Sequence, residues 1–257
     1  MSEIKGRPVW LELYTTDLER AKKFYGELLG WSFINPGDEF GGYHMVMLDD
    51  EAVGGAMQAI PGEGEADSFA VYLDTDDVAG VTETVRERGG QVLVEPMAIE
   101  GMGTMAFYIG PDGAAIGAWD GAQTEGQARN KPGAPSWFEL MTLRYDDSVD
   151  FYREVFGFDI VPMPADDDDN GMRYATNGAG NEAVAGICDA VAWFPADAQS
   201  FWRPYLDVTD TDAAVAKVTE LGGKLVDGPI DSPFGRVATV ADDQGTTFQI
   251  LGPVAAA

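Results

Sequence analysis

Apolar residues near the start of the chain change from an alternating to a helical spacing. In residues 9–15 they alternate with other residues, which predicts a strand with Leu11 and Leu13 on one face. Between Asp17, a good helix N-cap, and Gly30, a good helix end, they recur at helical spacing and predict an amphipathic helix. Further strands are predicted at residues 31–34, 43–48 and 54–59. The first unit is therefore predicted to be strand, helix, strand, strand, strand.

The same order of elements recurs along the rest of the chain. The second unit is predicted as a strand, a helix and three strands at residues 69–74, 78–88, 92–95, 104–109 and 114–119. The third and fourth units repeat the plan in the second half, where Pro135–Leu140 resembles Pro8–Leu13 and Tyr205–Asp207 resembles Tyr72–Asp74. Such self-similarity indicates an internal duplication, whose two halves we expect to fold alike.

The segment between the two halves has the composition of a linker. Residues 121–134 contain Gly, Gln and Pro and few apolar residues. We therefore predict an N-terminal domain of residues 1–122, a linker of residues 123–133 and a C-terminal domain of residues 134–257. Each domain is expected to hold two of the four units, so the fold class is α+β.

Composition restricts the kinds of partner. The 257 residues carry a net charge of −28, which repels phosphate groups, so nucleic acid and anionic membranes are poor partners. No apolar run approaches the roughly 20 residues that a membrane-spanning helix needs, and no signal peptide is recognisable, so we expect a cytoplasmic protein. Because each domain can be completed within the chain, we expect a monomer, with a homodimer as the alternative. The one cysteine, Cys188, is expected to be a core thiol.

Several motifs resemble a known superfamily. They are Asp17–Ala21 with Phe24-Tyr25, Leu29–Trp31, and Gly110–Gly113. Together they resemble the vicinal oxygen chelate superfamily of glyoxalases, extradiol dioxygenases and bleomycin-resistance proteins, and look most like its tandem two-domain members of actinobacterial type, often labelled glyoxalase or hydroxylase. The resemblance covers almost the whole chain. It implies four βαβββ modules paired into two U-shaped mixed sheets, whose concave faces hold the ligand and, in the enzymes, a divalent metal.

The residues at the metal-ligand positions that the resemblance implies are not metal ligands. The N-terminal domain has Trp10, residues 55–57, Ala70 and Gly117 there, and the C-terminal domain has Trp137, residues 186–188, Arg203 and Gln249. A catalytic divalent metal prefers imidazole and carboxylate ligands, and the chain has a single histidine. We therefore expect no metal cofactor. The alternative is a divalent metal held by carboxylates alone, with Glu12 or Glu139 joining Asp74 or Asp207.

Strand alternation assigns a set of side chains to the concave face of each domain. The predicted ligand-binding residues are Trp10, Glu12, Tyr14, Tyr72, Asp74 and Trp119 in the first domain, and Trp137, Glu139, Arg203, Tyr205 and Gln249 in the second, where Met141 and Asp207 share the face. Aromatic walls with a few polar groups suit a flat or amphipathic organic molecule.

Glu12 and Glu139 are the strongest candidates for polar contact with a ligand. Each stands on a mostly apolar strand, where burial raises the pKa of a carboxyl group, so each could anchor a ligand or act as a general base. The structural alternative is that Glu139 pairs with Arg203 and that Glu12 is bonded by Tyr14 or Tyr72. His44 is a second candidate acid or base, with an exposed or structural role as its alternative.

Two functional hypotheses follow. The first is a protein that binds an aromatic or amphipathic metabolite in its clefts without the superfamily's usual catalytic metal. The second is a glyoxalase-like or hydroxylase-like enzyme, either metal-free with Glu12 or His44 as its base, or with a reduced metal site. The sequence leaves open whether the protein is an enzyme.

Overall fold

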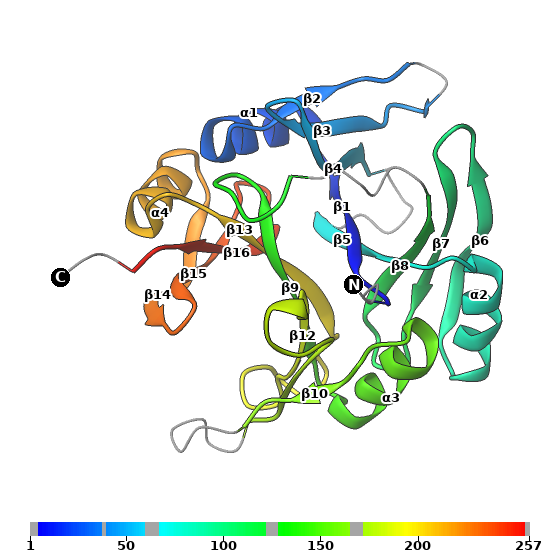
Figure 1. The fold of residues 1–257 in the computed structure, drawn as a ribbon. Helices are drawn as coiled ribbons and strands as arrows, with labels where there is room; N and C mark the ends of the chain where they lie inside the picture. The colour runs from blue at the N-terminus through cyan, green and yellow to red at the C-terminus, as the bar shows by residue number, and fades with distance from the viewer. Residues whose placement is uncertain (1–4, 38–39, 60–66, 122–127, 165–171, 255–257) are drawn as a thin grey trace. The chain divides into compact units, whose positions relative to one another are not determined.

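A computed structural model describes residues 5–37, 40–59, 67–121, 128–164 and 172–254 of the chain (Figure 1). The elements of the first half are β1 (Pro8–Thr15), α1 (Leu18–Leu29), β2 (Ser32–Ile34), β3 (His44–Leu48), β4 (Glu51–Gln58), β5 (Ser68–Asp74), α2 (Val78–Glu87), β6 (Gln91–Ile99), β7 (Gly103–Ile109) and β8 (Ala115–Asp120). Those of the second half are β9 (Pro135–Thr142), α3 (Tyr145–Phe156), β10 (Val161–Pro162), β11 (Tyr174–Thr176), the 3-10 helix η3 (Gly180–Glu182), β12 (Ala185–Asp189), β13 (Phe201–Asp207), α4 (Thr211–Glu220), β14 (Lys224–Ser232), β15 (Gly235–Ala241) and β16 (Thr247–Gly252).

The strands form two mixed sheets of the same topology. Their orders are β2-β3-β4-β1-β5-β8-β7-β6 and β10-β11-β12-β9-β13-β16-β15-β14. In both sheets the first strand of a unit lies parallel to the last strand of that unit, as β1 does to β4 and β9 to β12. The predicted α+β class and the four βαβββ units are therefore confirmed. No helix in the described part of the chain is long and apolar enough to cross a membrane.

Contacts between Cα atoms divide the chain into two compact parts, each with segments from both sequence halves. We call these parts unit 1 and unit 2, and they are distinct from the four βαβββ units of the sequence repeat. Unit 1 comprises residues 1–10, 70–125 and 137–202, and unit 2 comprises residues 11–69, 126–136 and 203–257. The boundaries that we predicted from the sequence repeat follow a different division of the chain and stay a prediction. Part of the predicted linker, residues 123–127, lies outside the described residues.

Unit 1 joins helices from both halves of the chain. Helix α2 lies against β6, β7 and β8 and also contacts α3 (Figure 1). The buried hydroxyl of Tyr152 on α3 accepts a hydrogen bond of 2.8 Å from the Trp202 indole, and its pKa is raised well above the usual value, chiefly by burial. Ser148, in the first turn of the same helix, donates a buried hydrogen bond of 2.8 Å to Asp112, which follows β7. The unit is therefore held by polar contacts as well as apolar packing.

Unit 2 is built in the same way around Tyr25 of α1. Helix α4 lies against β14, β15 and β16, and α1 contacts α4. The Tyr25 ring is fully buried, stacks on Trp31 with ring centroids 5.1 Å apart, and contacts Phe69 and Phe248 edge-on or tilted. Its hydroxyl donates a hydrogen bond of 2.9 Å to Asp242. One tyrosine thus links a helix of the first half to a turn of the second.

The predicted limits of the first helix are confirmed. The Asp17 side chain accepts a hydrogen bond from the Arg20 amide as an N-cap, and Gly30 ends the helix with a φ of 76°. Strand β6 is longer than predicted from the sequence. The prediction ended it at residue 95, whereas the strand continues through Pro96 to Ile99. The β6–β7 register shifts on both sides of Val94, and a proline is tolerated at such an irregularity because the regular hydrogen-bond ladder is interrupted there.

Candidate functional site

Glu12 lies on β1 within unit 2, opposite a glycine. The parallel β1–β4 register sets it beside Gly55, and the antiparallel β3–β4 register sets Met45 on the other side of that glycine. Tyr43 immediately precedes β3 in the chain, and its hydroxyl donates a hydrogen bond of 3.4 Å to the Glu12 carboxyl group. Any side chain at position 55 would collide with this hydroxyl. Gly55 therefore lets the tyrosine reach across β4 to the glutamate.

Burial changes the acidity of Glu12. The residue is 6% exposed, and desolvation raises the pKa of its carboxyl group from the usual 4.5 to about 7. Hydrogen bonds from the Tyr14 and Tyr43 hydroxyls oppose the rise but are the smaller effect. At neutral pH the protonated and ionised forms are therefore both well populated, and the group can either donate or accept a hydrogen bond. The Tyr14 bond was one of the structural alternatives proposed for Glu12 from the sequence.

The sheet face around Glu12 is apolar and partly open. By strand register, Tyr14, Met45 and Met57 share this face, and each is half-buried. Ile34 of β2 pairs with Met45 and is 53% exposed. A single buried carboxyl group therefore lies within a surface of aromatic, thioether and aliphatic side chains.

His44 does not join Glu12. It pairs with Ala56, which also pairs with Leu13, so strand alternation sets His44 and Leu13 on the face opposite Glu12. The imidazole Nδ1 lies 2.9 Å from the carbonyl oxygen of Gly42. The structure thus separates the two residues that we predicted as candidate bases.

The second half repeats the arrangement within unit 1. Glu139 of β9 pairs with Gly186 of β12, and the Tyr174 hydroxyl of β11 donates a hydrogen bond of 3.0 Å to Glu139. A side chain at position 186 would collide with that hydroxyl. The indole of Trp137 donates a further hydrogen bond of 3.0 Å to the Tyr174 hydroxyl. Glutamate, tyrosine and glycine therefore form the same contact in both halves.

Neither Tyr43 nor Tyr174 was predicted from the sequence as a site residue. A signal was present, because Tyr43 precedes Gly55 by the same number of residues as Tyr174 precedes Gly186. Comparison of the third and fourth strands of the duplicated units would have shown this pairing. It would not have shown which residue the hydroxyl reaches, since that depends on strand register.

An apolar cluster lies next to Glu139 on the same sheet face. It contains Met141 and Cys188, each 2% exposed, and the buried Ala190. Packed against these residues are Leu143, Met172, Tyr174, Phe194 and Phe201. The Cys188 sulfur lies 3.8 Å from the Met172 sulfur. The prediction of a core thiol at Cys188 is therefore confirmed.

The other predicted ligand-binding residues of the first half lie in unit 1. Tyr72 pairs with Gly117, and its ring fills the space that a side chain at 117 would take and tilts against Phe107 at 5.5 Å. Asp74 pairs with Trp119, so both share the Tyr72 face. Trp10, on the unit 1 part of β1, is half-buried. Their ligand-binding roles stay predictions.

The predicted ligand-binding residues of the second half lie in unit 2, apart from Trp137 and Glu139, which lie in unit 1. Tyr205 pairs with Gln249, whose side-chain oxygen accepts a hydrogen bond of 3.1 Å from Thr239. The Arg203 guanidinium lies 5.8 Å from the centre of the Tyr205 ring. Asp207 accepts a hydrogen bond from Ser136, and burial raises the pKa of its carboxyl group. Here too the ligand-binding roles stay predictions.

These residues do not fit the divalent metal of the metal-dependent relatives. Among the described residues, no three or more His, Cys, Asp or Glu side chains come together in a group that could hold a metal ion. At Glu12 the partners are two tyrosine hydroxyls and a glycine, which leaves one carboxylate as the donor. Stable sites for catalytic metals use several imidazole and carboxylate ligands.

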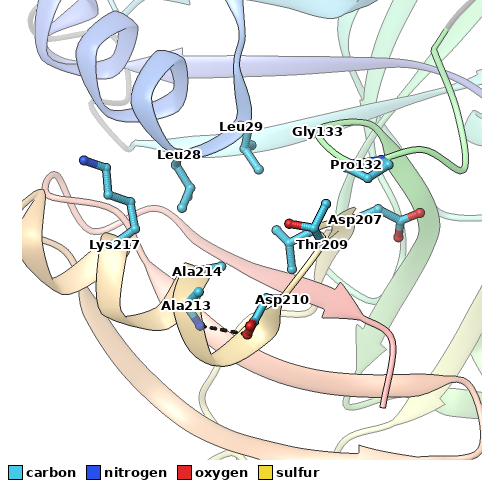
Figure 2. A pocket seen from close by; sticks show the side chains of 11 residues that line it. Leu28, Leu29, Pro132, Gly133, Asp207, Thr209, Asp210, Ala213, Ala214 and Lys217 are labelled. Carbon is cyan, nitrogen blue, oxygen red and sulfur yellow. Dashed lines mark hydrogen bonds between the residues drawn. The ribbon is translucent and has the colours of Figure 1, made fainter. Parts of the chain in front are cut away.

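A separate cavity of about 260 Å³ lies in unit 2 between the end of α1 and the start of α4 (Figure 2). Its charged side chains already have partners within the protein. Asp210 caps α4 by accepting a hydrogen bond of 3.0 Å from the Ala213 amide, and Lys217 pairs with Glu27 and Glu220. The cavity contains none of the residues that we predicted as catalytic.

The fold and the paired units define the class of protein. The sequence-family model of the Glyoxalase/Bleomycin resistance protein/Dioxygenase superfamily matches residues 7–117 and 135–250 of this chain. The chain therefore belongs to this superfamily, as a tandem member with two such domains.

Named relatives match nearly the whole chain. The putative glyoxylase CFP32 of Mycobacterium tuberculosis is 35% identical over 255 residues, which cover 97% of this chain and 95% of the relative. The anthracycline biosynthesis protein DnrV of Streptomyces peucetius is 31% identical over 261 residues, which cover 96% of this chain and 93% of the relative.

Solved structures share the fold at low identity. The Mn(II)-bound glyoxalase from Novosphingobium aromaticivorans has a TM-score of 0.67 at 16% identity and covers 98% of this chain and 83% of its own. The 2,3-dioxygenase LapB from Pseudomonas sp. KL28 has a TM-score of 0.66 at 14% identity and covers 98% of this chain and 94% of its own. At such identities the likeness extends to the fold alone.

Proposed function

We propose that this protein binds a planar, largely apolar organic molecule at Glu12 and that it does so without a metal. The observation that carries the proposal is the buried Glu12 carboxyl group, hydrogen-bonded by Tyr14 and Tyr43 within an otherwise apolar sheet face. Ligand sites commonly combine apolar walls with a few polar groups that fix orientation. A lone carboxyl group in such a wall serves that purpose.

The chemistry of the site suggests the class of ligand. With a pKa of about 7, Glu12 accepts a hydrogen bond from a ligand hydroxyl or amine when ionised and donates one to a ligand carbonyl when protonated. The half-buried Met45, Met57 and Tyr14 offer an adaptable apolar surface to a ring system. Phenols and hydroxyquinones combine these features. The name of the relative DnrV, an anthracycline biosynthesis protein, agrees with a polycyclic aromatic ligand.

The second candidate is an enzyme in which Glu12 is a general base. The raised pKa favours it, because a base works best when its pKa lies near the operating pH. In that case the ionised Glu12 removes a proton from a bound substrate, and the Tyr14 and Tyr43 hydroxyls hold the carboxylate in place. The name of the relative CFP32, a putative glyoxylase, suggests a glyoxalase-like reaction. A hydroxylase-like reaction is the alternative within the same superfamily.

Native mass spectrometry of the protein purified without chelator is the first test. An apo mass, or a copurified organic adduct without metal, is expected, and a stoichiometric divalent metal would contradict the metal-free proposal. The same spectrum distinguishes the monomer that we propose from a homodimer.

A binding titration with a dihydroxyanthraquinone tests the ligand class. The unchanged protein is expected to bind this probe, and Glu12→Gln is expected to weaken binding at least about tenfold, because one charge-assisted hydrogen bond is lost. An affinity that Glu12→Gln leaves unchanged would contradict the assignment of Glu12. The enzyme candidate makes a different prediction, in which Glu12→Gln abolishes turnover but leaves substrate affinity nearly unchanged.

A further inference from the structure

The two Glu–Tyr–Gly arrangements of the chain differ in what lies beside them. We infer that the chain has one open ligand site, at Glu12, and that protein side chains close the equivalent site at Glu139. This inference rests on the proposed function, because it assigns the proposed ligand to one of two similar places. It also specifies a stoichiometry of one ligand per chain.

Exposure of matched residues is the first observation. Tyr14 lies two residues after Glu12 on β1, and Met141 lies two residues after Glu139 on β9, so the two are equivalent. Tyr14 is half-buried, whereas Met141 is 2% exposed. One strand further along the sheet the same contrast recurs, since Met57 of β4 is half-buried and Cys188 of β12 is 2% exposed. Among the described residues, the sheet face next to the glutamate is thus partly exposed in one copy and covered in the other.

The side chains that cover the second copy are identifiable. Met172 lies against Cys188 with a sulfur–sulfur distance of 3.8 Å, and Phe194 packs on the same cluster. The Phe194 ring meets the Phe201 ring edge-on at 5.6 Å. The chain turns after β12 so that the Phe194 amide donates a hydrogen bond of 3.3 Å to the Ala190 carbonyl oxygen, which fixes the direction of the loop. The cover is therefore part of the folded structure of unit 1.

The hydrogen bonds to the two glutamates also differ. In the second copy Trp137 donates to Tyr174, which donates to Glu139, and both distances are 3.0 Å. In the first copy the distance from Tyr43 to Glu12 is 3.4 Å, longer than a strong hydrogen bond between oxygens, and Tyr14 also donates to Glu12. Tyr43 therefore lies less close to its glutamate than Tyr174 does.

A third difference lies on the neighbouring strand. Met45 of β3 pairs with Gly55 as Thr176 of β11 pairs with Gly186. Met45 is a half-buried apolar side chain, whereas Thr176 is buried and donates a hydrogen bond of 2.7 Å to the Gly178 carbonyl oxygen. The adaptable apolar wall of the first copy is therefore absent from this position of the second.

The closed copy also suggests the shape of the proposed ligand. Phe194 and Met172 bring an aromatic ring and a thioether onto the face beside Glu139. A ligand that fills the equivalent space beside Glu12 would bring its own ring there, against Tyr14 and Met57. By comparison with the second copy, we therefore expect the part of the ligand that lies beside Glu12 to be an aromatic group.

Hydroxyl-radical footprinting tests the closure without any ligand. Because oxidation of sulfur-containing and aromatic side chains follows their exposure, Tyr14 and Met57 should be modified at least about tenfold faster than Met141 and Cys188 after correction for intrinsic reactivity. Comparable rates for the two pairs would overturn the inference, whatever the ligand.

Titration with the dihydroxyanthraquinone tests the stoichiometry. One equivalent should bind per chain, and the double variant Met172→Ala with Phe194→Ala, which uncovers the second face, should bind a second equivalent or protect Met141 when the probe is present. The single variant Phe194→Ala is a milder change that serves if the double variant does not fold. Two equivalents bound by the unchanged protein would overturn the inference. No binding by the unchanged protein, together with protected Met141 and Cys188, would contradict the proposed function while supporting the closed second copy.

Discussion

Replacement of Glu12 by glutamine should change how the stability of the protein depends on pH. The carboxyl group has a pKa of about 7 in the folded protein and the usual 4.5 when the chain is unfolded. Between these values the folded state holds a proton that the unfolded state has released. Stability from this group is therefore fully present below pH 4.5 and is lost as the pH rises through 7.

The magnitude follows from the two pKa values. At about 1.4 kcal/mol for each pH unit, moving the pKa from 4.5 to about 7 corresponds to about 3 kcal/mol between acidic and alkaline conditions. Glutamine is similar in size and does not titrate, so the variant loses this dependence. Relative to the unchanged protein, Glu12→Gln should gain about 3 kcal/mol between pH 4.5 and pH 8.

Urea unfolding at a series of pH values provides the assay. The informative quantity is the difference in unfolding free energy between the variant and the unchanged protein at each pH, because contributions from other groups cancel in that difference. Glu182→Gln, at an exposed position, controls for the loss of one negative charge. A difference that stays constant from pH 4.5 to pH 8 would refute the assignment of a buried, protonated Glu12.

Further predictions concern three other positions. Tyr25→Phe should lower the unfolding free energy by about 1–3 kcal/mol in urea titrations, because it removes a buried hydrogen-bond donor from Asp242, and no change would contradict that role. Gly55→Ala should displace the Tyr43 hydroxyl, cost about 1–3 kcal/mol of stability and weaken binding of the anthraquinone probe, and unchanged affinity would separate Tyr43 from the site. Cys188 should react with a thiol reagent at least about a hundredfold more slowly in the native protein than in urea, and rapid native labelling would contradict its burial.

The fold could be predicted because it depends on patterns that recur in the sequence. The alternation from residue 9 to residue 15 and the helical spacing between Asp17 and Gly30 each report a buried face, and their repetition revealed the four units. The continuation of β6 past residue 95 was not predicted, and a proline such as Pro96 is in general unfavourable within a strand. A shifted register, which no local pattern shows, accommodates it.

The candidate site could be predicted only in part. Glu12 was identified because a carboxyl group on an apolar strand is unusual, and its burial agrees with that reasoning. Tyr43 was missed, since its contact with Glu12 depends on the β1–β4 and β3–β4 registers and on the absence of a side chain at Gly55. The face on which His44 lies also depends on register, because a shift of one residue would move it to the other side of the sheet.

The internal duplication allows shared features to be separated from those specific to one half. A glutamate opposite a glycine, with a tyrosine reaching across, occurs in the first βαβββ unit of each half and is therefore a feature that the two halves share. What differs is the neighbouring surface, which is half-buried at Tyr14 and Met57 and covered at Met141 and Cys188. Covering an apolar face with the chain's own side chains stabilises that half, whereas an open apolar face gains this stabilisation only when something binds to it. A ligand at the proposed Glu12 site is therefore expected to increase stability more than one at the covered face.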